Sequence, residues 1–128
     1  METALQPGEM IAAFDVPVAP WMRRSLYLKV CDRESYEFAV AAAAVALDIQ
    51  NGKVADSRIA LGGVATVPWR AKAAEDVLRG QPVDDQIFDA AAEVAFSGAR
   101  GRTHNAFKIA LGKRTVARAL RQAAAMDI

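Results

Sequence analysis

Two consecutive stretches decide the fold of this 128-residue chain: RSLYLKVCDRESYEFAVAAAAVA, residues 24–46, and LDIQNGKVADSRIALGGVATVPWR, residues 47–70. Apolar and polar side chains alternate over Ser25–Cys31. A period of two predicts a strand with one buried face. The other face carries Tyr27 and Lys29, a phenol and an ammonium that suit a polar ligand.

A hairpin follows this strand, centred on Asn51-Gly52, a pair that supplies the positive φ angles of a type I′ turn. The turn joins two apolar runs, Phe38–Gln50 and Lys53–Val64. The alanines at 41–46 are also good helix sequence, but we favour a strand because the turn needs two partners. Both faces of the first run are apolar, so we expect a central strand covered by helices. Gly62-Gly63 lets the second strand bend or accept close packing.

Shorter segments flank the hairpin. Glu9–Val16 is a strand candidate that ends at Pro17, and a loop then continues to Pro20. Val67–Arg70 is predicted to be a short connector. We expect Trp69 within it to close the edge of the core.

Helical signals fill the remaining sequence. A short surface helix that carries Glu75 should end at Gly80. Asp84 is the expected N-cap of the next helix. Thr103 or Asn105 should cap the last helix, which carries Ile109, Val116, Leu120 and Ala123 inward.

The order of these elements, strands first and helices after, predicts an α+β fold. We expect a two-layer sandwich in which helices pack on an antiparallel sheet. The length fits one domain, residues 1–128.

Charge and hydropathy exclude several function classes. The net charge of +1 provides no global field for nucleic acid. No apolar run approaches the roughly 20 residues that span a bilayer, and the start has no signal-peptide pattern. We therefore expect a cytoplasmic protein that contacts neither membrane nor nucleic acid. Residues 100–121 are basic without an acid; we favour a solvated helix face over a docking surface for an acidic partner.

Residues for catalysis or metal binding are scarce. Cys31 is the single cysteine and His104 the single histidine, so neither a disulfide nor a metal cluster can form from them. No Ser-His-Asp or Cys-His set can be assembled. We predict no catalytic residues and no metal ligands in this chain.

Several motifs resemble the C-terminal domain of the flavoprotein (medium) subunit of molybdenum hydroxylases, the xanthine dehydrogenase and carbon monoxide dehydrogenase family. They are LQPGEMI (5–11), YLKV (27–30), DRESYEFA (32–39), RIALGGVATVPWRA (58–71) and HNAFKIALGKRTVARAL (104–120). The resemblance covers nearly the whole chain. SYEFA, LGGVATVPWRA and HNAFK are its most specific pieces.

This resemblance implies a component of an FAD-dependent oxidoreductase, with no complete active site in this chain. In the family the domain closes over part of an FAD that an N-terminal domain binds. A two-[2Fe-2S] subunit and a molybdopterin subunit complete the complex, and electrons pass from molybdenum through the clusters to FAD. Met1 falls where the linker between the two flavoprotein domains would lie. We therefore expect the FAD-binding domain to be absent, which leaves a fragment, a split-gene product or a truncated gene as alternatives.

The resemblance implies cofactor contacts for only two residues. Tyr27 and Lys29 match the family segment beside the flavin ring, where the tyrosine would pack and the lysine would hydrogen-bond or stabilise a reduced, anionic ring. An ordinary exposed strand face is the alternative. For Ser35 and Tyr36 we favour a capping or core role. A freestanding interaction or dimerisation module, or a truncated relic without flavin chemistry, remains the second hypothesis for the chain.

Overall fold

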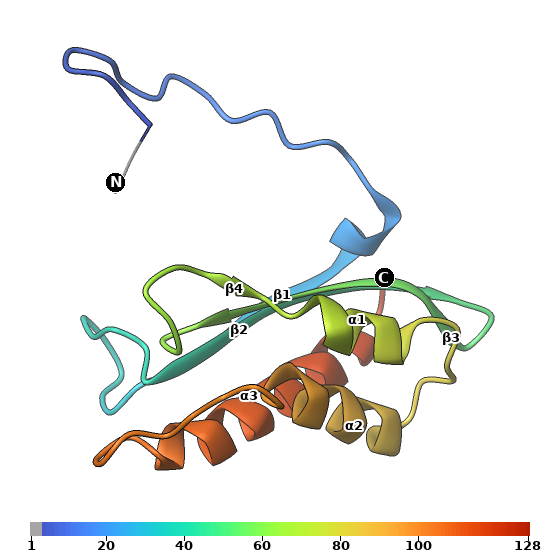
Figure 1. Ribbon diagram of the computed structural model, residues 1–128. Coiled ribbons are helices and arrows are strands. Elements are labelled where there is room, and N and C mark those ends of the chain that lie inside the picture. Colours follow the sequence, from blue (N-terminus) through green and yellow to red (C-terminus); the bar gives the residue numbers. More distant parts are fainter. Residues whose placement is uncertain (1–3) are drawn as a thin grey trace.

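A four-stranded antiparallel sheet forms one layer of the fold in the computed structural model, which describes residues 4–128 (Figure 1). Its spatial order β1-β2-β3-β4 follows the chain. The strands are β1 (Arg24–Val30), β2 (Ala41–Gln50), β3 (Lys53–Gly62) and β4 (Trp69–Arg70). The predicted antiparallel sheet is confirmed, with β2 in the interior of the sheet.

Three helices form the second layer: α1 (Lys72–Leu78), α2 (Asp85–Ala95) and α3 (Phe107–Ala124). α3 packs on β1 and β2, α1 packs on β3, and α2 lies between α1 and α3. A short 3₁₀ turn, η1 (Pro20–Arg23), precedes β1 and contacts β2. The α+β two-layer sandwich predicted from the sequence is therefore confirmed. No helix among residues 4–128 is long and apolar enough to cross a membrane.

The hairpin forms as its turn residues predict. Asn51 and Gly52 have φ angles of 52° and 74°, as a type I′ turn requires. The alanine-rich segment is a strand, although it begins at Ala41 rather than at Phe38. β2 starts late because its partner β1 ends at Val30, which is directly opposite Ala41.

The core lies between the helices and one face of the sheet. Ala43, Val45 and Leu47 of β2 and Ile59 of β3 belong to it, together with Leu120 of α3. Burying one Leu or Ile side chain stabilises the fold by about 1.5–3 kcal/mol. The expectation that helices cover β2 is met on this face alone, since α1, α2 and α3 lie on one side of the sheet, whereas the short η1 contacts β2 from the other side (Figure 1).

The strand predicted at Glu9–Val16 does not form. These residues are extended and exposed, and they pair with no strand of the described chain. The ring of Phe14 is 80% exposed. The segment is apolar, but it runs away from the sheet and finds no edge to extend (Figure 1).

The predicted connector Val67–Arg70 contains a strand instead. β4 pairs with β3 through Ala60↔Arg70 and Leu61↔Trp69. Two residues are too short a run for a period of two to be recognised in the sequence.

The helix caps agree with the sequence at one helix and differ at another. Asp84 caps α2, as predicted, and its Oδ1 accepts from the backbone N–H of Ile87 at 2.8 Å. The predicted caps of the last helix are wrong, because the N-cap position is Ala106. The Asn105 side chain accepts from the backbone N–H of Arg102 at 2.6 Å, so it closes the preceding turn.

The end of α3 is held by β1. Arg24 Nη1 donates to the carbonyl of Ala124 at 3.2 Å and also to that of Met126. A cation here satisfies carbonyls that lack intrahelical partners and opposes the helix dipole. This contact joins the two layers at one end of the sheet.

Candidate functional site

The sheet face opposite the helices has a floor of very small side chains. Residues directly opposite one another in antiparallel strands share a face. One row across the sheet is Tyr27, Ala44, Ala60 and Arg70; the next rows are Lys29, Ala42 and Gly62, and Ser25, Ala46 and Arg58. The centre of this open face therefore consists of alanine and glycine, while larger side chains stand at the two sides. Ala44 is the exposed alanine of this floor on β2 and can be approached closely by a planar ring or another backbone, whereas Ala42 and Ala46 are buried.

Tyr27 and Lys29, the two predicted cofactor contacts, stand together on one side of this floor. They are two residues apart on β1, so their Cα atoms are about 6.6 Å apart. The Tyr27 side chain is 64% exposed. Lys29 Nζ donates to the backbone carbonyl of Glu37. An ammonium has three donors, so Lys29 keeps two N–H groups for a ligand.

A cation–aromatic contact forms the opposite side of the floor. The Arg58 guanidinium lies 5.2 Å from the ring centroid of Trp21 in η1. Asp56 Oδ1 accepts from Arg58 Nη1 at 2.5 Å. This hydrogen bond lowers the pKa of the Asp56 carboxyl below its ordinary value. The Arg58 guanidinium is thereby held between the Asp56 carboxylate and the Trp21 ring.

A buried carboxylate orients the second arginine of this face. The predicted surface position of Glu75 is wrong, since the residue is 5% exposed. Its Oε1 accepts from the backbone N–H of Ile59 at 2.8 Å and from Arg70 Nε, and its Oε2 accepts from Arg70 Nη2 at 3.0 Å. Ala71, directly after β4, donates its backbone N–H to the Ile59 carbonyl at 2.9 Å, while the carboxylate of α1 accepts the Ile59 N–H in place of a strand carbonyl. The hydrogen bond to Glu75 raises the pKa of Arg70 above its ordinary value.

Trp69 does not close the core edge as predicted. It is opposite Leu61 on the helix side of the sheet, and it remains 55% exposed. Its neighbour Arg70 lies on the open face. Trp69 and Arg70 therefore lie on opposite faces of the sheet.

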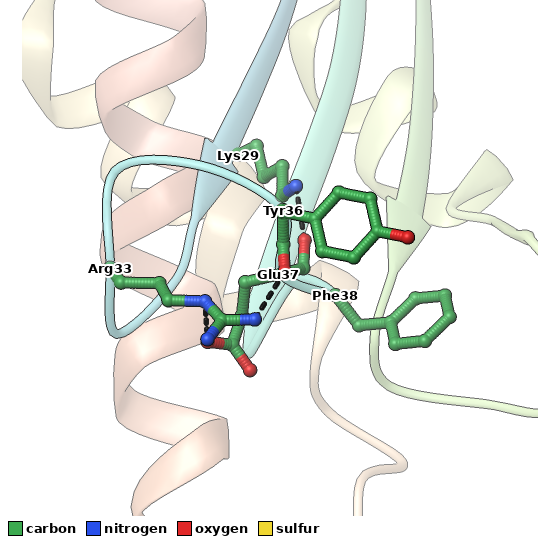
Figure 2. A pocket seen from close by; sticks show the side chains of 5 residues that line it. All are labelled: Lys29, Arg33, Tyr36, Glu37 and Phe38. Atoms are coloured by element: carbon green, nitrogen blue, oxygen red, sulfur yellow. Dashed lines mark hydrogen bonds and ion pairs between the residues drawn. The ribbon is translucent and has the colours of Figure 1, made fainter.

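The connection from β1 to β2 borders the open face near Lys29 (Figure 2). Arg33 donates to the carbonyl of Tyr36 and forms an ion pair with Glu37 at 2.9 Å. The rings of Tyr36 and Phe38 extend to the same side, away from Arg33, and are 97% and 95% exposed. A depression of about 600 Å³ lies among these side chains. The core role favoured for Ser35 and Tyr36 is wrong, because both residues are exposed, and no helix of the described chain begins beside either of them for a capping role.

Sequence reasoning missed Trp21, Arg58 and Arg70 as neighbours of Tyr27. The alternation of β3 was visible, with Ile59 and Leu61 inward, and it already places Arg58 on the opposite face. No local signal announces Trp21, which reaches this face only because η1 folds back onto β2. Among residues 4–128, no group of three or more His, Cys, Asp or Glu side chains could hold a metal ion.

Comparison with known proteins identifies the fold family. Residues 26–123 match the model of the CO dehydrogenase flavoprotein C-terminal domain. The chain belongs to this family. Tyr27 and Lys29 lie inside the matched range, whereas Trp21 precedes it.

Relatives of this CO dehydrogenase flavoprotein C-terminal domain include characterised oxidoreductase subunits. The chain is 39% identical over 125 residues to the aldehyde oxidoreductase FAD-binding subunit PaoB of Escherichia coli, a match covering 98% of this chain and 36% of that protein. It is 38% identical to the carbon monoxide dehydrogenase medium chain of Afipia carboxidovorans, covering 73% of this chain and 32% of that one. The chain therefore spans about a third of the length of these relatives.

Solved structures agree with this assignment. Reconstituted CO dehydrogenase from Oligotropha carboxidovorans superimposes with a TM-score of 0.83 at 30% identity, covering 98% of this chain and 45% of that chain. Quinoline 2-oxidoreductase from Pseudomonas putida 86 superimposes with a TM-score of 0.72 at 30% identity, covering 79% of this chain and 36% of that chain.

Proposed function

We propose that this chain is the C-terminal part of the FAD-binding subunit of a cytoplasmic molybdenum hydroxylase, where its open sheet face closes over the flavin. The observation that carries this proposal is the alanine–glycine floor beside Tyr27 and Lys29, inside the range that matches the flavoprotein family. The chain then contributes to a redox complex without holding a complete active site.

The residues of the open face fit one wall of a flavin site. The floor is flat enough for a ring to lie on it, the exposed Tyr27 phenol can pack against the ring, and Lys29 can donate to it. The flavin itself would supply the electron-accepting chemistry. The helices of the described chain lie in the other layer, so their N-termini do not offer phosphate sites on this face. An N-terminal domain would therefore have to hold the pyrophosphate, and we place it outside this sequence.

The proposed partners follow from the assignment of the flavin ring to this chain and of the pyrophosphate to an N-terminal domain. The FAD-binding domain would meet the open face and the extended segment before η1, where Phe14 and its apolar neighbours are exposed. A [2Fe-2S] subunit and a molybdopterin subunit would complete the path of electrons to FAD. Substrate choice would belong to the molybdopterin subunit.

A two-piece titration tests this function. The purified chain and an N-terminal FAD-binding domain of the same family are mixed, and flavin fluorescence and absorbance are followed with each piece alone and with both. We expect tight FAD retention only when both pieces are present, because each supplies one side of the site. Absence of binding between the pieces, with the flavin spectrum unchanged, would contradict the proposal.

The second hypothesis, a freestanding dimerisation module, predicts a different result in the same samples. Sedimentation would show a concentration-dependent dimer of the chain alone, and FAD would change neither the dimer nor its stability. The two hypotheses are thus separated by one set of measurements.

A further inference from the structure

A second depression lies on the helix side of the sheet, away from Tyr27 and Lys29. It has a volume of about 370 Å³ and lies between the β3–β4 loop and the end of α2. Leu61, Trp69 and Phe96 supply its apolar walls, and Arg100 lies at the same site. Trp69 and Leu61 form one cross-strand pair, so this site and the open face belong to opposite sides of the sheet.

The two loops around this depression are tied together by hydrogen bonds. Lys108 Nζ, at the start of α3, donates to the carbonyl of Gly63 at 3.0 Å. Gly63 packs against the backbone of Ala39, to which an added Cβ would come within 2.9 Å. Beyond α2, the backbone N–H of Ala99 donates to the carbonyl of Phe96 at 3.0 Å. The walls are therefore held in place without a ligand, which reduces the entropy lost on binding.

Arg100 carries an uncompensated charge at this site. Two basic side chains further along α3 are paired, with Lys113 bound to Glu93 and Arg121 bound to Asp85 and Asp89. For Arg100, the structure of residues 4–128 records no ion pair and no side-chain hydrogen bond. An acidic group brought beside it would not have to displace a partner.

We propose that this depression, the Trp69 pocket, is a docking site for a partner polypeptide that inserts a large apolar side chain and places an adjacent carboxylate on Arg100. The inference goes beyond flavin contact, because the occupant would lie on the other side of the sheet. Exposed tryptophan and arginine are the residues that most often dominate binding at protein interfaces. The basic stretch around the α2–α3 connection then has a docking role at this one point, while Lys113 and Arg121 of α3 pair with acids of α2.

The chain contains its own reporter for this site. Trp69 and Trp21 are the two tryptophans, and they lie on opposite sides of the sheet. Their indole N–H signals can be followed separately in ¹H–¹⁵N spectra of the full chain. The probe is the capped tetrapeptide acetyl-Ala-Phe-Asp-Ala-amide, and its matched control has Asn in place of Asp.

We expect the Asp peptide to shift the Trp69 signal saturably and to leave that of Trp21 unchanged. The Asn peptide should bind roughly fivefold more weakly, as should the Asp peptide to an Arg100→Gln variant, which is the range of an exposed ion pair. Arg102→Gln, a neighbouring arginine that does not line the pocket, should bind like the wild type. All these variants change exposed side chains, so their spectra should otherwise retain the wild-type fold.

Other outcomes overturn the proposal. Equal shifts at Trp69 and Trp21, or no shift at Trp69, would show that the pocket does not bind this peptide chemistry. Binding that ignores both Arg100→Gln and the Asp-to-Asn change would remove the role of charge. Binding of 3-phenylpropionate without binding of the peptide would indicate a small-molecule site. The FAD titration is independent of these results, because Arg100 is not part of the open face.

Discussion

At the residue scale, Glu75 shows how a local pattern can mislead. On a helix of seven residues it reads as a surface acid, yet it is buried beneath Arg70 and bonded to the backbone of Ile59. The sequence contains both charges, but their pairing depends on where α1 crosses the edge of β3. Tyr27 and Lys29 could be placed on a common face from alternation alone, since that step needs only the period of a strand.

The Glu75 carboxylate should therefore stabilise the fold. Glu75→Gln keeps the shape but removes the charge that binds Arg70, and we expect a loss of about 2 kcal/mol in the free energy of unfolding. Urea unfolding followed by circular dichroism measures this. Asp76→Asn is the matched control, because the Asp76–Arg79 pair is exposed and should contribute less than about 0.5 kcal/mol. Equal effects in the two variants would contradict the structural role of Glu75.

Asp56 predicts a dependence of stability on pH. Its folded-state pKa is lowered by Arg58, so the contribution is present above the ordinary pKa of 3.8 and is lost as pH falls through the folded value. Asp56→Asn should lose less stability than the wild type between about pH 5 and pH 2. Thermal unfolding at a series of pH values tests this. If the exposed Asp32→Asn control flattened the profile as much, the pairing with Arg58 would not be the cause.

At the scale of elements, the alanines of β2 show which features a sequence can predict. The Asn51-Gly52 turn required two strands, and this decided correctly between helix and strand. The expectation of helices on both faces failed because α1, α2 and α3 lie on one side of the sheet; on the other side Ala42 and Ala46 are buried without a helical layer, and Ala44 is an exposed alanine. On the open face, each alanine of β2 projects only a methyl group above the backbone. The strand predicted at Glu9–Val16 does not form, since an apolar segment becomes a strand only where a neighbouring strand can pair with it.

Gly63 joins three elements, and its replacement should be costly. Its φ is +73°, and an added Cβ would approach the Ala39 carbonyl oxygen to 2.9 Å. Gly63→Ala should therefore lower the free energy of unfolding by about 2 kcal/mol. Gly98→Ala, with nothing within 4 Å of the added Cβ, is the control and should change it by less than about 0.5 kcal/mol. Similar denaturant midpoints for the two variants would be the contrary result.

At the scale of the whole molecule, the sheet separates two surfaces with different chemistry. One side carries the alanine–glycine floor with Tyr27 and Lys29, and the other carries the helices and the Trp69 pocket. A domain of this form can face a flavin on one side while a partner polypeptide binds on the other. The sequence predicted the layers because strands preceded helices. It could not predict the pocket, because Trp69 and Arg100 come together only when α2 is packed.

The most direct test of the flavin-facing floor is the FAD affinity of the two-piece assembly, measured by flavin fluorescence for four variants. Tyr27→Ala and Lys29→Ala should each weaken retention, by about tenfold if one aromatic packing contact or one charged hydrogen bond is lost. Phe107→Ala and Lys53→Ala, which change exposed residues outside the floor, should retain the wild-type affinity. If Tyr27→Ala and Lys29→Ala bound FAD as tightly as these controls, the open sheet face would not be the wall of a flavin site.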